Sequence, residues 1–587
     1  MYGQPSNSNN TPMFEGFFLQ MVMPSQEGKC QEIITQVLGS DWEVKLIGDN
    51  GTEFEITKSD ANTLSTKEAW DKAYYLRSQP GVVYVEPLFA VPVAMPVQPT
   101  QNFNQDTNQP SRNLTGFDDP KQQNINDESS DADWPLKQLR VFETWQRFFP
   151  DPNKLPGDGI LIGHPDTGYT PHPEIISNLL LNKAFDFLKQ DKDPVDELET
   201  SPNEIINNPG HGTSTASVIV STKGKQANYP TAKSITGVAP GAKLVPLRVS
   251  LSVVLISIVN ISKAIEYAAD NGIHVITISL GTAFPSQRLR SAIVYAQKRG
   301  VIIVAASGTA VPFVVWPAAY EEVIAVTGCN VRREVWSGAS RGKQVDVTAP
   351  GAGVWYAKTN KTDAGLEYDI NQGDGTSFSA PFIAGVAALW LSYHGRDQLI
   401  QRYGAEKIPF IFNQILRDSC EKFPTWKPNK FGEGLVNAEK VLDSPLPDNQ
   451  NQSLMAPAFA LQQHSPIDNG INTFNLLFEQ QLVNNQPEEE DSLETPDDNT
   501  MLKLSLAQLL QTTPSELPKR LKEVGKELAF HFAADPQLYN QLTQTIQAPK
   551  PGIASFKTQQ DPSNNLNNLR ARLLLQGTSE VLKNKIN

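Results

Sequence analysis

The sequence predicts an α/β protein whose central part is a parallel β-sheet covered by helices on both faces. Short runs of Val and Ile recur through the middle of the chain, and segments with helical periodicity, such as SKAIEYAADNG at 262–272, lie between them. Because strands of a parallel sheet are buried on both faces, they form continuous apolar runs rather than alternating ones. We therefore expect strands at 160–163, 275–280, 301–306 and 323–326.

A separate, small α+β domain of the ferredoxin-like type is expected at residues 13–93. Its patterns follow the order strand, helix, strand, strand, helix, strand, which is the order of that fold. Ser65 followed by Glu68 is the signature of a capping box, so the second helix is expected to begin there. The run VVYV at 82–85 is expected to be the last strand.

Composition sets the remaining boundaries. Segments rich in Asn, Gln and Pro lack periodicity and are expected to be linkers or tails. Near the C-terminal end, apolar residues from Leu517 to Phe532 recur at intervals of three and four, which indicates one amphipathic helix. The expected parts are a disordered tail (1–12), a linker (94–130), the large α/β domain (131–445), an acidic Asn/Gln-rich linker (446–500), a short helical region (501–547) and a mostly disordered tail (548–587).

Charge and composition exclude several classes of partner. Acidic residues outnumber basic ones, 64 to 50, which argues against a nucleic-acid partner because such proteins need a basic surface. The three cysteines are too few for a disulfide framework. The most apolar stretch, at 249–261, is too short to span a bilayer, so no membrane partner is expected. The N-terminal residues lack the features of a secretory signal, which favours a cytoplasmic location, while secretion by another route stays open.

Three reactive side chains stand among small residues in the large α/β domain. Asp166 follows an expected strand, and the carboxyl ends of parallel strands are where such sheets bind ligands. His211 lies between glycines in GHGTSTAS, and Ser377 precedes a long helix of apolar and small residues. Each alone has a structural explanation: a turn, a structural histidine or a helix N-cap. Together they supply a carboxylate, a base and a nucleophile.

The motifs around these residues resemble those of the subtilisin-like serine proteases, the subtilases of peptidase family S8. Similar motifs occur over residues 134–442, and residues 13–93 are similar to the inhibitory propeptide of this family. The resemblance implies a subtilisin-like three-layer α/β fold. The motifs are GHPDTGYTPHPEI (163–175), HGTSTASVI (211–219), GVAPGAKLVPLRV (237–249), SLG (279–281), WPAAYEEVIAVTG (316–328), DVTAPG (346–351), GTSFSAPFIAGVAAL (375–389) and GEGLVNAEKVL (432–442).

The resemblance implies a serine endopeptidase that hydrolyses peptide bonds of extended peptides or proteins. Ser377 is then the nucleophile, His211 the general base and Asp166 the carboxylate that orients it. The backbone N–H of Ser377 is expected to donate to the oxyanion. An extended substrate is expected to pair with a strand edge formed by Ser279, Leu280 and Gly281.

One position departs from the family's pattern. Family members usually place an asparagine beyond the VIIVAA-type strand as the second oxyanion donor, and Thr309 occupies that place here. Loss of one such donor in this family lowers turnover by about 10²–10³. A threonine hydroxyl can donate a hydrogen bond, but the threonine side chain is shorter than that of asparagine. A degenerate subtilase that serves as a binding or scaffold module therefore stays open. A peptide ligase or cyclase that uses the same acyl-enzyme is a second alternative, which no particular residue favours.

The resemblance also carries expectations about regulation and cofactors. The propeptide-like domain implies a self-inhibited precursor, with autoprocessing expected within 94–130. No cofactor is required. Glu174 matches a position that often ligates structural calcium in relatives, but the loop expected to complete that site carries three lysines, which cannot ligate calcium. Structural calcium therefore stays open but is not indicated, and no residue is assigned as a metal ligand.

Overall fold

The computed structural model describes residues 12–24, 27–58, 64–92, 130–199, 208–222, 229–231, 233–253, 255–423, 426–448, 473–478, 498–546 and 562–587. The chain divides into two compact units. The first unit comprises Met1–Asp106, Ala283–Arg288 and Ser465–Asn587. The second unit comprises Thr107–Thr282 and Leu289–His464.

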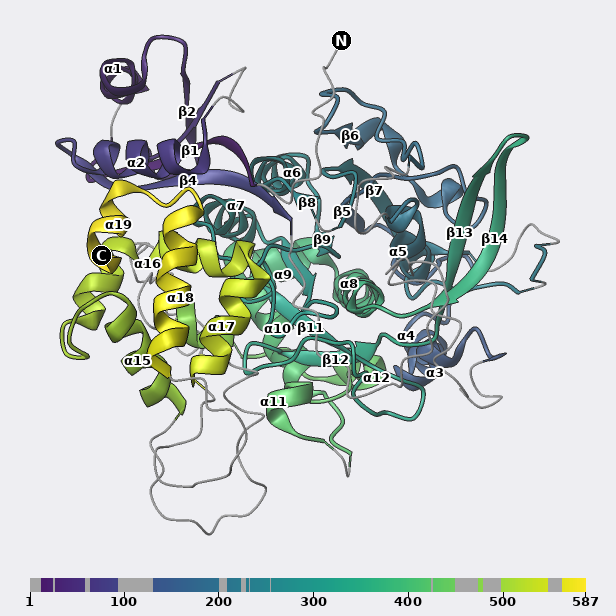
Figure 1. The fold of residues 1–587 in the computed structure, drawn as a ribbon. Coiled ribbons are helices and arrows are strands. Elements are labelled where there is room, and N and C mark those ends of the chain that lie inside the picture. The colour runs from purple at the N-terminus through teal and green to yellow at the C-terminus, as the bar shows by residue number, and fades with distance from the viewer. Residues whose placement is uncertain are drawn as a thin grey trace, which may run out of the picture. The chain divides into compact units, whose positions relative to one another are not determined.

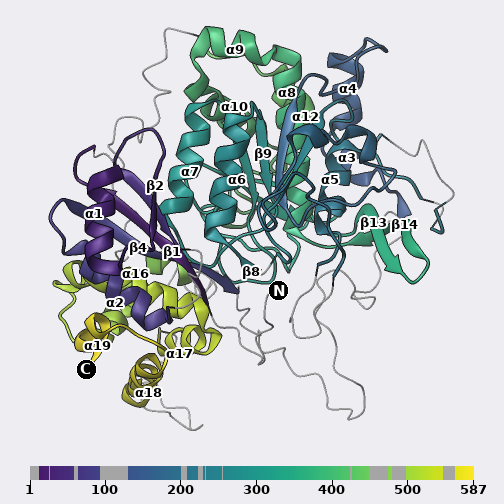
Figure 2. The ribbon, with the colours of Figure 1, turned by 90° about the horizontal axis from the view of Figure 1, so that it is seen from above.

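The second unit is built on a seven-stranded parallel β-sheet (Figure 2). Its strands are β5 (Leu161–Asp166), β6 (Phe185–Asp186), β7 (Lys243–Arg248), β9 (Val275–Ile278), β10 (Ile302–Ala306), β11 (Ile324–Cys329) and β12 (Val347–Pro350). They lie in the order β12-β11-β10-β9-β5-β7-β6. Every residue of β9, β10, β11 and β12 is buried, as expected for strands covered on both faces.

Helices cover both faces of this sheet and make the second unit a three-layer structure. Its remaining elements are α3 (Trp134–Gln138), α4 (Val141–Phe148), α5 (His211–Val220), β8 (Leu255–Ile256), α6 (Ile258–Asp270), α7 (Gln287–Lys298), β13 (Val354–Thr362), β14 (Gly365–Gly373), α8 (Thr376–His394), α9 (Arg396–Tyr403), α10 (Ile408–Asp418), α11 (Pro428–Phe431) and α12 (Ala438–Asp443). Figure 2 shows α6 and α7 on one face of the sheet and α5 and α8 on the other. The predicted α/β fold class is therefore confirmed.

Helix α8 forms the centre of the hydrophobic core of the second unit. It contacts strands β9, β10, β11 and β12, and its apolar and small side chains are buried almost along its whole length. By length and composition α8 is the one helix of the described residues that could cross a bilayer. A buried core helix passes the same test, and 83% of the apolar window of α8 is buried inside the protein.

The first unit begins with the predicted α+β domain, which we call the N-terminal domain (residues 12–92). Its elements are β1 (Met13–Met21), α1 (Glu27–Leu38), β2 (Glu43–Ile47), β3 (Glu53–Thr57), α2 (Thr66–Arg77) and β4 (Val82–Pro92). These strands pair antiparallel in the order β2-β3-β1-β4. The predicted capping box is present, since Ser65 Oγ accepts from the N–H of Glu68 and the Glu68 carboxylate accepts from the N–H of Ser65. Strand β4 extends well beyond the predicted run 82–85.

The described residues after 497 form five helices, which we call the C-terminal helical unit. They are α15 (Asp498–Leu509), α16 (Leu517–Ala534), α17 (Pro536–Ile546), α18 (Pro562–Leu575) and α19 (Glu580–Ile586). The prediction of a mostly disordered tail at 548–587 is therefore wrong for its last 26 residues, 562–587. Leu569, Leu573, Leu582 and Ile586 are fully buried, and α18 packs against α15 and α17. These apolar residues are buried because neighbouring helices cover them. The short, polar sequence of this segment does not predict such neighbours on its own.

The predicted linkers lie mostly outside the described residues. Within 94–130 only Ser130 is described, and the expected tail at 1–12 is described only at its last residue. Within 446–500, residues 473–478 are helical. Phe478 of this turn stacks on Tyr539 of α17, with ring centroids 4.6 Å apart. This part of the predicted second linker is therefore packed into the first unit.

Candidate active site

Three elements of the second unit carry the predicted catalytic side chains. Asp166 is the last residue of β5, His211 is the first residue of α5 and Ser377 is the second residue of α8. Helix α5 packs against both β5 and α8, which joins these three parts of the chain in space. The carboxyl ends of parallel strands lie at one edge of a sheet, where ligands bind in open α/β folds.

A buried hydrogen bond joins Asp166 to His211. Asp166 Oδ1 lies 2.7 Å from His211 Nδ1, and neither side chain is exposed to solvent. The same carboxylate oxygen accepts the N–H of Thr167 at 2.8 Å. Burial alone would raise the pKa of Asp166, but the charge and hydrogen bond of His211 outweigh it and lower the pKa below its ordinary value. The ionised carboxylate therefore holds Nδ1, which places Nε2 on the opposite side of the ring.

Two glycines allow α5 to approach β5 closely enough for this bond. Gly210 precedes α5 with a φ of 76°, in the left-handed region that favours glycine. A Cβ atom on Gly212 would lie 2.0 Å from the carbonyl oxygen of Gly168. Any side chain at Gly212 would therefore push the start of α5, and His211 with it, away from Asp166.

Ser377 and Ser279 form a reciprocal pair of hydrogen bonds. The Ser377 hydroxyl donates to the carbonyl oxygen of Ser279 at 3.2 Å, and the Ser279 hydroxyl donates to the carbonyl oxygen of Ser377 at 2.8 Å. Ser377 is only partly buried, while Thr376 and Phe378 on either side of it are buried. The hydroxyl of Ser377 is thus the group of this turn that a reactant can reach.

Just beyond β9 lie the predicted substrate-binding residues Ser279, Leu280 and Gly281. The strand ends at Ile278, so the predicted strand 275–280 is two residues too long. Thr282, the residue after Gly281, forms an isolated antiparallel bridge with Trp316. Because an incoming peptide would supply the pairing partner, substrate binding by these three residues stays a prediction.

Thr309 lies against the residue that precedes the predicted nucleophile. Its hydroxyl oxygen accepts the N–H of Thr376 at 3.2 Å and lies 3.2 Å from the Thr376 hydroxyl. The Thr376 hydroxyl in turn accepts the N–H of Gly308. The Thr309 hydroxyl is therefore held at the N-terminal end of α8, beside Ser377.

Asp196 supports this site and was missed by the sequence analysis. Its buried carboxylate accepts from the Thr167 hydroxyl at 2.7 Å, from the N–H of Gly210 at 2.9 Å and from the N–H of Leu198 at 2.9 Å. Burial raises the pKa of Asp196, and these hydrogen bonds oppose that shift. Because Thr167 follows Asp166 and Gly210 precedes His211, one carboxylate ties together the two segments that carry them. The loop sequence DPVDELE offers no motif that would single it out.

Glu174, the position associated with calcium in the family, is also buried. Its carboxylate accepts a hydrogen bond from the Ser221 hydroxyl. Among the residues that the structure describes, no group of three His, Cys, Asp or Glu side chains is arranged to hold a metal ion.

Comparisons with known proteins match the second unit to a family of proteases. The model of the subtilase family matches residues 157–408. M-protease of Shouchella clausii (strain KSM-K16) is 31% identical over 288 residues, which are 49% of this chain and 64% of that protein. Subtilisin Savinase of Lederbergia lenta is 30% identical over 288 residues, and the match covers 91% of it. This chain thus spans slightly under two thirds of the first relative and nearly all of the second.

A solved structure supports the fold. Fervidolysin of Fervidobacterium pennivorans, described as a keratinolytic enzyme related to subtilisin, matches with a TM-score of 0.52 at 21% sequence identity. The match covers 76% of this chain and 63% of that one.

The expectation of a cytoplasmic location is wrong. The relatives that the chain matches, among them M-protease and Subtilisin Savinase, are secreted extracellular enzymes. The absence of signal features near residue 1 was the only ground for that expectation, and it carries no weight against these relatives.

Replacing Asp196 with alanine tests its supporting role. Asp196→Ala leaves three buried donors without an acceptor, and each costs roughly 1–3 kcal/mol, so we expect the denaturant midpoint of the second unit to fall clearly. Asp196→Asn keeps one acceptor oxygen and should lose much less. The urea midpoints of both variants are measured by circular dichroism. An equal fall of the midpoint in the two variants would show that the three hydrogen bonds do not stabilise this region.

Proposed function

The chain belongs to the subtilase family, and we propose that it is a serine endopeptidase that hydrolyses extended peptide or protein substrates. The observation that carries this proposal is the buried hydrogen bond between Asp166 and His211 at the edge of the sheet where α8 presents Ser377. A carboxylate, an imidazole and a reachable hydroxyl are the groups that a serine nucleophile and its base use for acyl transfer.

The proposed reaction begins when the Ser377 hydroxyl turns from the Ser279 carbonyl to His211 Nε2. Ser377 Oγ attacks the scissile carbonyl carbon while His211 takes the hydroxyl proton, and a tetrahedral intermediate forms. His211 then gives this proton to the leaving amine, the C–N bond breaks and an acyl-enzyme remains. Water then attacks the ester carbonyl carbon while His211 takes a proton from it. The bond to Ser377 Oγ breaks, His211 returns the proton to Ser377, and the acid leaves.

Asp166 keeps His211 effective through these steps. Its hydrogen bond to Nδ1 holds the tautomer in which Nε2 accepts a proton. Its lowered pKa keeps the carboxylate charged, so it stabilises the imidazolium that forms in the transition state. General acid–base catalysis of this kind contributes about 10²–10⁴-fold to the rate.

The oxyanion is proposed to bind at the N-terminal end of α8. The N–H of Ser377 is the first donor, supported by the positive end of the helix dipole. The second is the Thr309 hydroxyl, whose oxygen accepts the N–H of Thr376 while its proton can turn toward the oxyanion. The substrate strand is proposed to pair with Ser279, Leu280 and Gly281, and the N-terminal domain to act as the inhibitor of a precursor.

Thr309 also favours a second candidate function, a degenerate subtilase that binds peptides without cleaving them. Its hydroxyl oxygen lies 3.2 Å from both the N–H and the hydroxyl of Thr376. If the Thr309 hydroxyl donates its hydrogen bond to the Thr376 hydroxyl, it cannot donate to the oxyanion, which then has one donor fewer.

A fluorophosphonate probe tests the endopeptidase proposal. We expect the probe to label the wild-type protein after the N-terminal domain has been removed, and expect no labelling of Ser377→Ala. Ser392→Ala, a change at another serine of α8, is the matched control and should label like the wild type. Absence of labelling in the wild type, or equal labelling of Ser377→Ala, would contradict the proposal.

Substitutions at Thr309 separate the two candidate functions. Thr309→Asn should raise turnover of a peptide substrate by up to about 10²–10³, the value known for the oxyanion asparagine of subtilisin itself. Thr309→Val, which removes only the hydroxyl, should lower turnover if the hydroxyl donates to the oxyanion. An inactive wild type that becomes active with Thr309→Asn would instead support the degenerate form.

A further inference from the structure

An aromatic cluster joins the N-terminal domain to the C-terminal helical unit inside the first unit. Phe530 of α16 packs on Phe89 of β4, with ring centroids 4.7 Å apart, and on Trp70 of α2 at 5.8 Å. All three rings are at least 95% buried. In both views α16 and α19 lie beside α2 (Figure 1; Figure 2). Without the helices, the N-terminal domain would expose two large aromatic side chains that are now covered.

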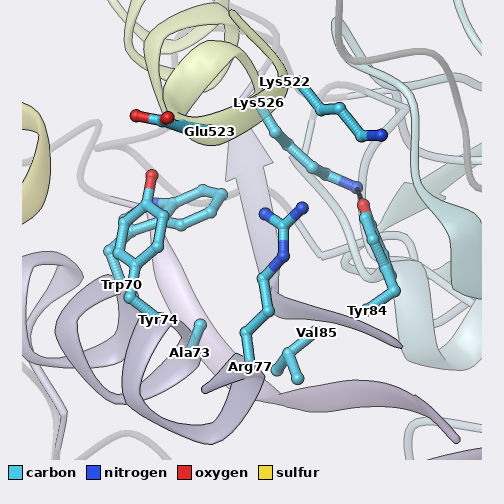
Figure 3. Close-up of a pocket in the computed structure, with 9 residues that line it drawn as sticks. All are labelled: Trp70, Ala73, Tyr74, Arg77, Tyr84, Val85, Lys522, Glu523 and Lys526. Carbon is cyan, nitrogen blue, oxygen red and sulfur yellow. Dashed lines mark hydrogen bonds between the residues drawn. The ribbon is translucent and has the colours of Figure 1, made fainter. Parts of the chain in front are cut away.

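A buried carboxylate of β4 pairs with a lysine of the C-terminal helical unit. Glu86 is fully buried and forms an ion pair with Lys526 of α16. Lys526 Nζ also donates to the Tyr84 hydroxyl at 2.6 Å, and that hydroxyl donates to Glu86 at 2.9 Å. Figure 3 shows Lys526 reaching from α16 to Tyr84. The other oxygen of Glu86 accepts from Ser286, in the segment 283–288 of the first unit.

A second buried carboxylate makes the complementary connection from the helices to α2. Glu527 of α16 is fully buried and accepts from the Tyr74 hydroxyl at 3.0 Å. It also accepts from the N–H and the hydroxyl of Ser579, which caps α19, at 2.7 Å each. Burial and the charge of Glu527 raise the pKa of Tyr74, so Tyr74 remains a neutral donor. Asp71 of α2 accepts the N–H of Glu580 at 2.8 Å.

We propose that the C-terminal helical unit is a clamp that keeps the N-terminal domain bound after the chain has been cut between residues 94 and 129. Separation would leave the buried carboxylate of Glu86 without its lysine, and a buried charge that loses its charged partner is strongly unfavourable. The same separation would expose Phe530, Phe89 and Trp70 to water. Non-covalent contacts therefore join the N-terminal domain to the C-terminal helical unit. These contacts remain when the chain is cut between residues 94 and 129.

This inference has a regulatory consequence that rests on the proposed function. If the N-terminal domain inhibits the protease, a single cut in the connecting segment does not release it. Release then requires a second event that removes or unfolds the C-terminal helical unit.

The test uses the full chain with Ser377→Ala, so that binding is measured in a protein without the proposed nucleophile. Recognition sequences for a site-specific protease are inserted within 94–129 and within 449–472, and an affinity tag follows Asn587. After cutting, the tagged C-terminal piece is captured and the N-terminal piece that stays with it is quantified. We expect nearly equal amounts of the two pieces.

Two sets of variants show which contacts retain the N-terminal piece. Lys526→Glu should lower the retained amount about tenfold or more, because it puts a second carboxylate beside Glu86. Lys519→Glu, the same change at an exposed position of α16, is the control and should have no effect. Lys67→Glu should lower retention about two- to fivefold, and adding Glu580→Lys should restore it, since the partly exposed Lys67 and the exposed Glu580 form an ion pair at 3.0 Å.

The outcomes are decisive in both directions. Loss of the N-terminal piece from the wild-type capture, or full retention in Lys526→Glu, would overturn the proposal. If circular dichroism shows that Lys526→Glu unfolds the helices, the test rests on the pair Lys67 and Glu580. Failure of the double variant Lys67→Glu, Glu580→Lys to restore binding would then overturn the proposal. Because no step needs catalysis, these results are independent of fluorophosphonate labelling, which tests the proposed function separately.

Discussion

The hydrogen bond between Asp166 and His211 is the constraint around which the candidate active site is organised. It requires a carboxylate at the very end of β5 and an imidazole at the very start of α5, both withdrawn from water. Gly212 permits the approach because a Cβ there would collide with the Gly168 carbonyl. Asp196 then fixes the two flanking segments together. The glycine directly after His211 is thus explained by one short contact between a strand and a helix.

Local patterns were sufficient to predict the sheet and the three candidate catalytic residues. Strands buried on both faces form apolar runs that are recognisable without knowledge of their neighbours, and the motifs at Asp166, His211 and Ser377 are contiguous in the sequence. The role of Asp196 depends on partners in two other segments, so the sequence held no local signal for it. Ser279 was expected in a strand that ends one residue earlier, because strand length is set by the pairing partner.

Contacts between distant segments, which leave no local signal in the sequence, are even more important for the C-terminal helices. Tyr74 and Glu527 lie 453 residues apart in the chain and meet in a buried hydrogen bond. Hydrophobic periodicity indicated that α16 needs a partner surface, but not which one. The candidate site and the first unit also differ in the contacts that hold them. The candidate site is built from small residues and short hydrogen bonds, whereas the first unit buries ion pairs such as Glu86 with Lys526 and Glu55 with Arg288, which are favourable only while both partners are present.

The central claim is that Asp166 orients His211 so that it can activate Ser377. The most direct measurement is the rate of acylation by a small activated ester, in wild type and in Asp166→Asn, across a range of pH. The account predicts a fall of about 10⁴ in Asp166→Asn at neutral pH, because the amide stabilises the wrong tautomer of His211. A variant that acylates at nearly the wild-type rate would contradict the account.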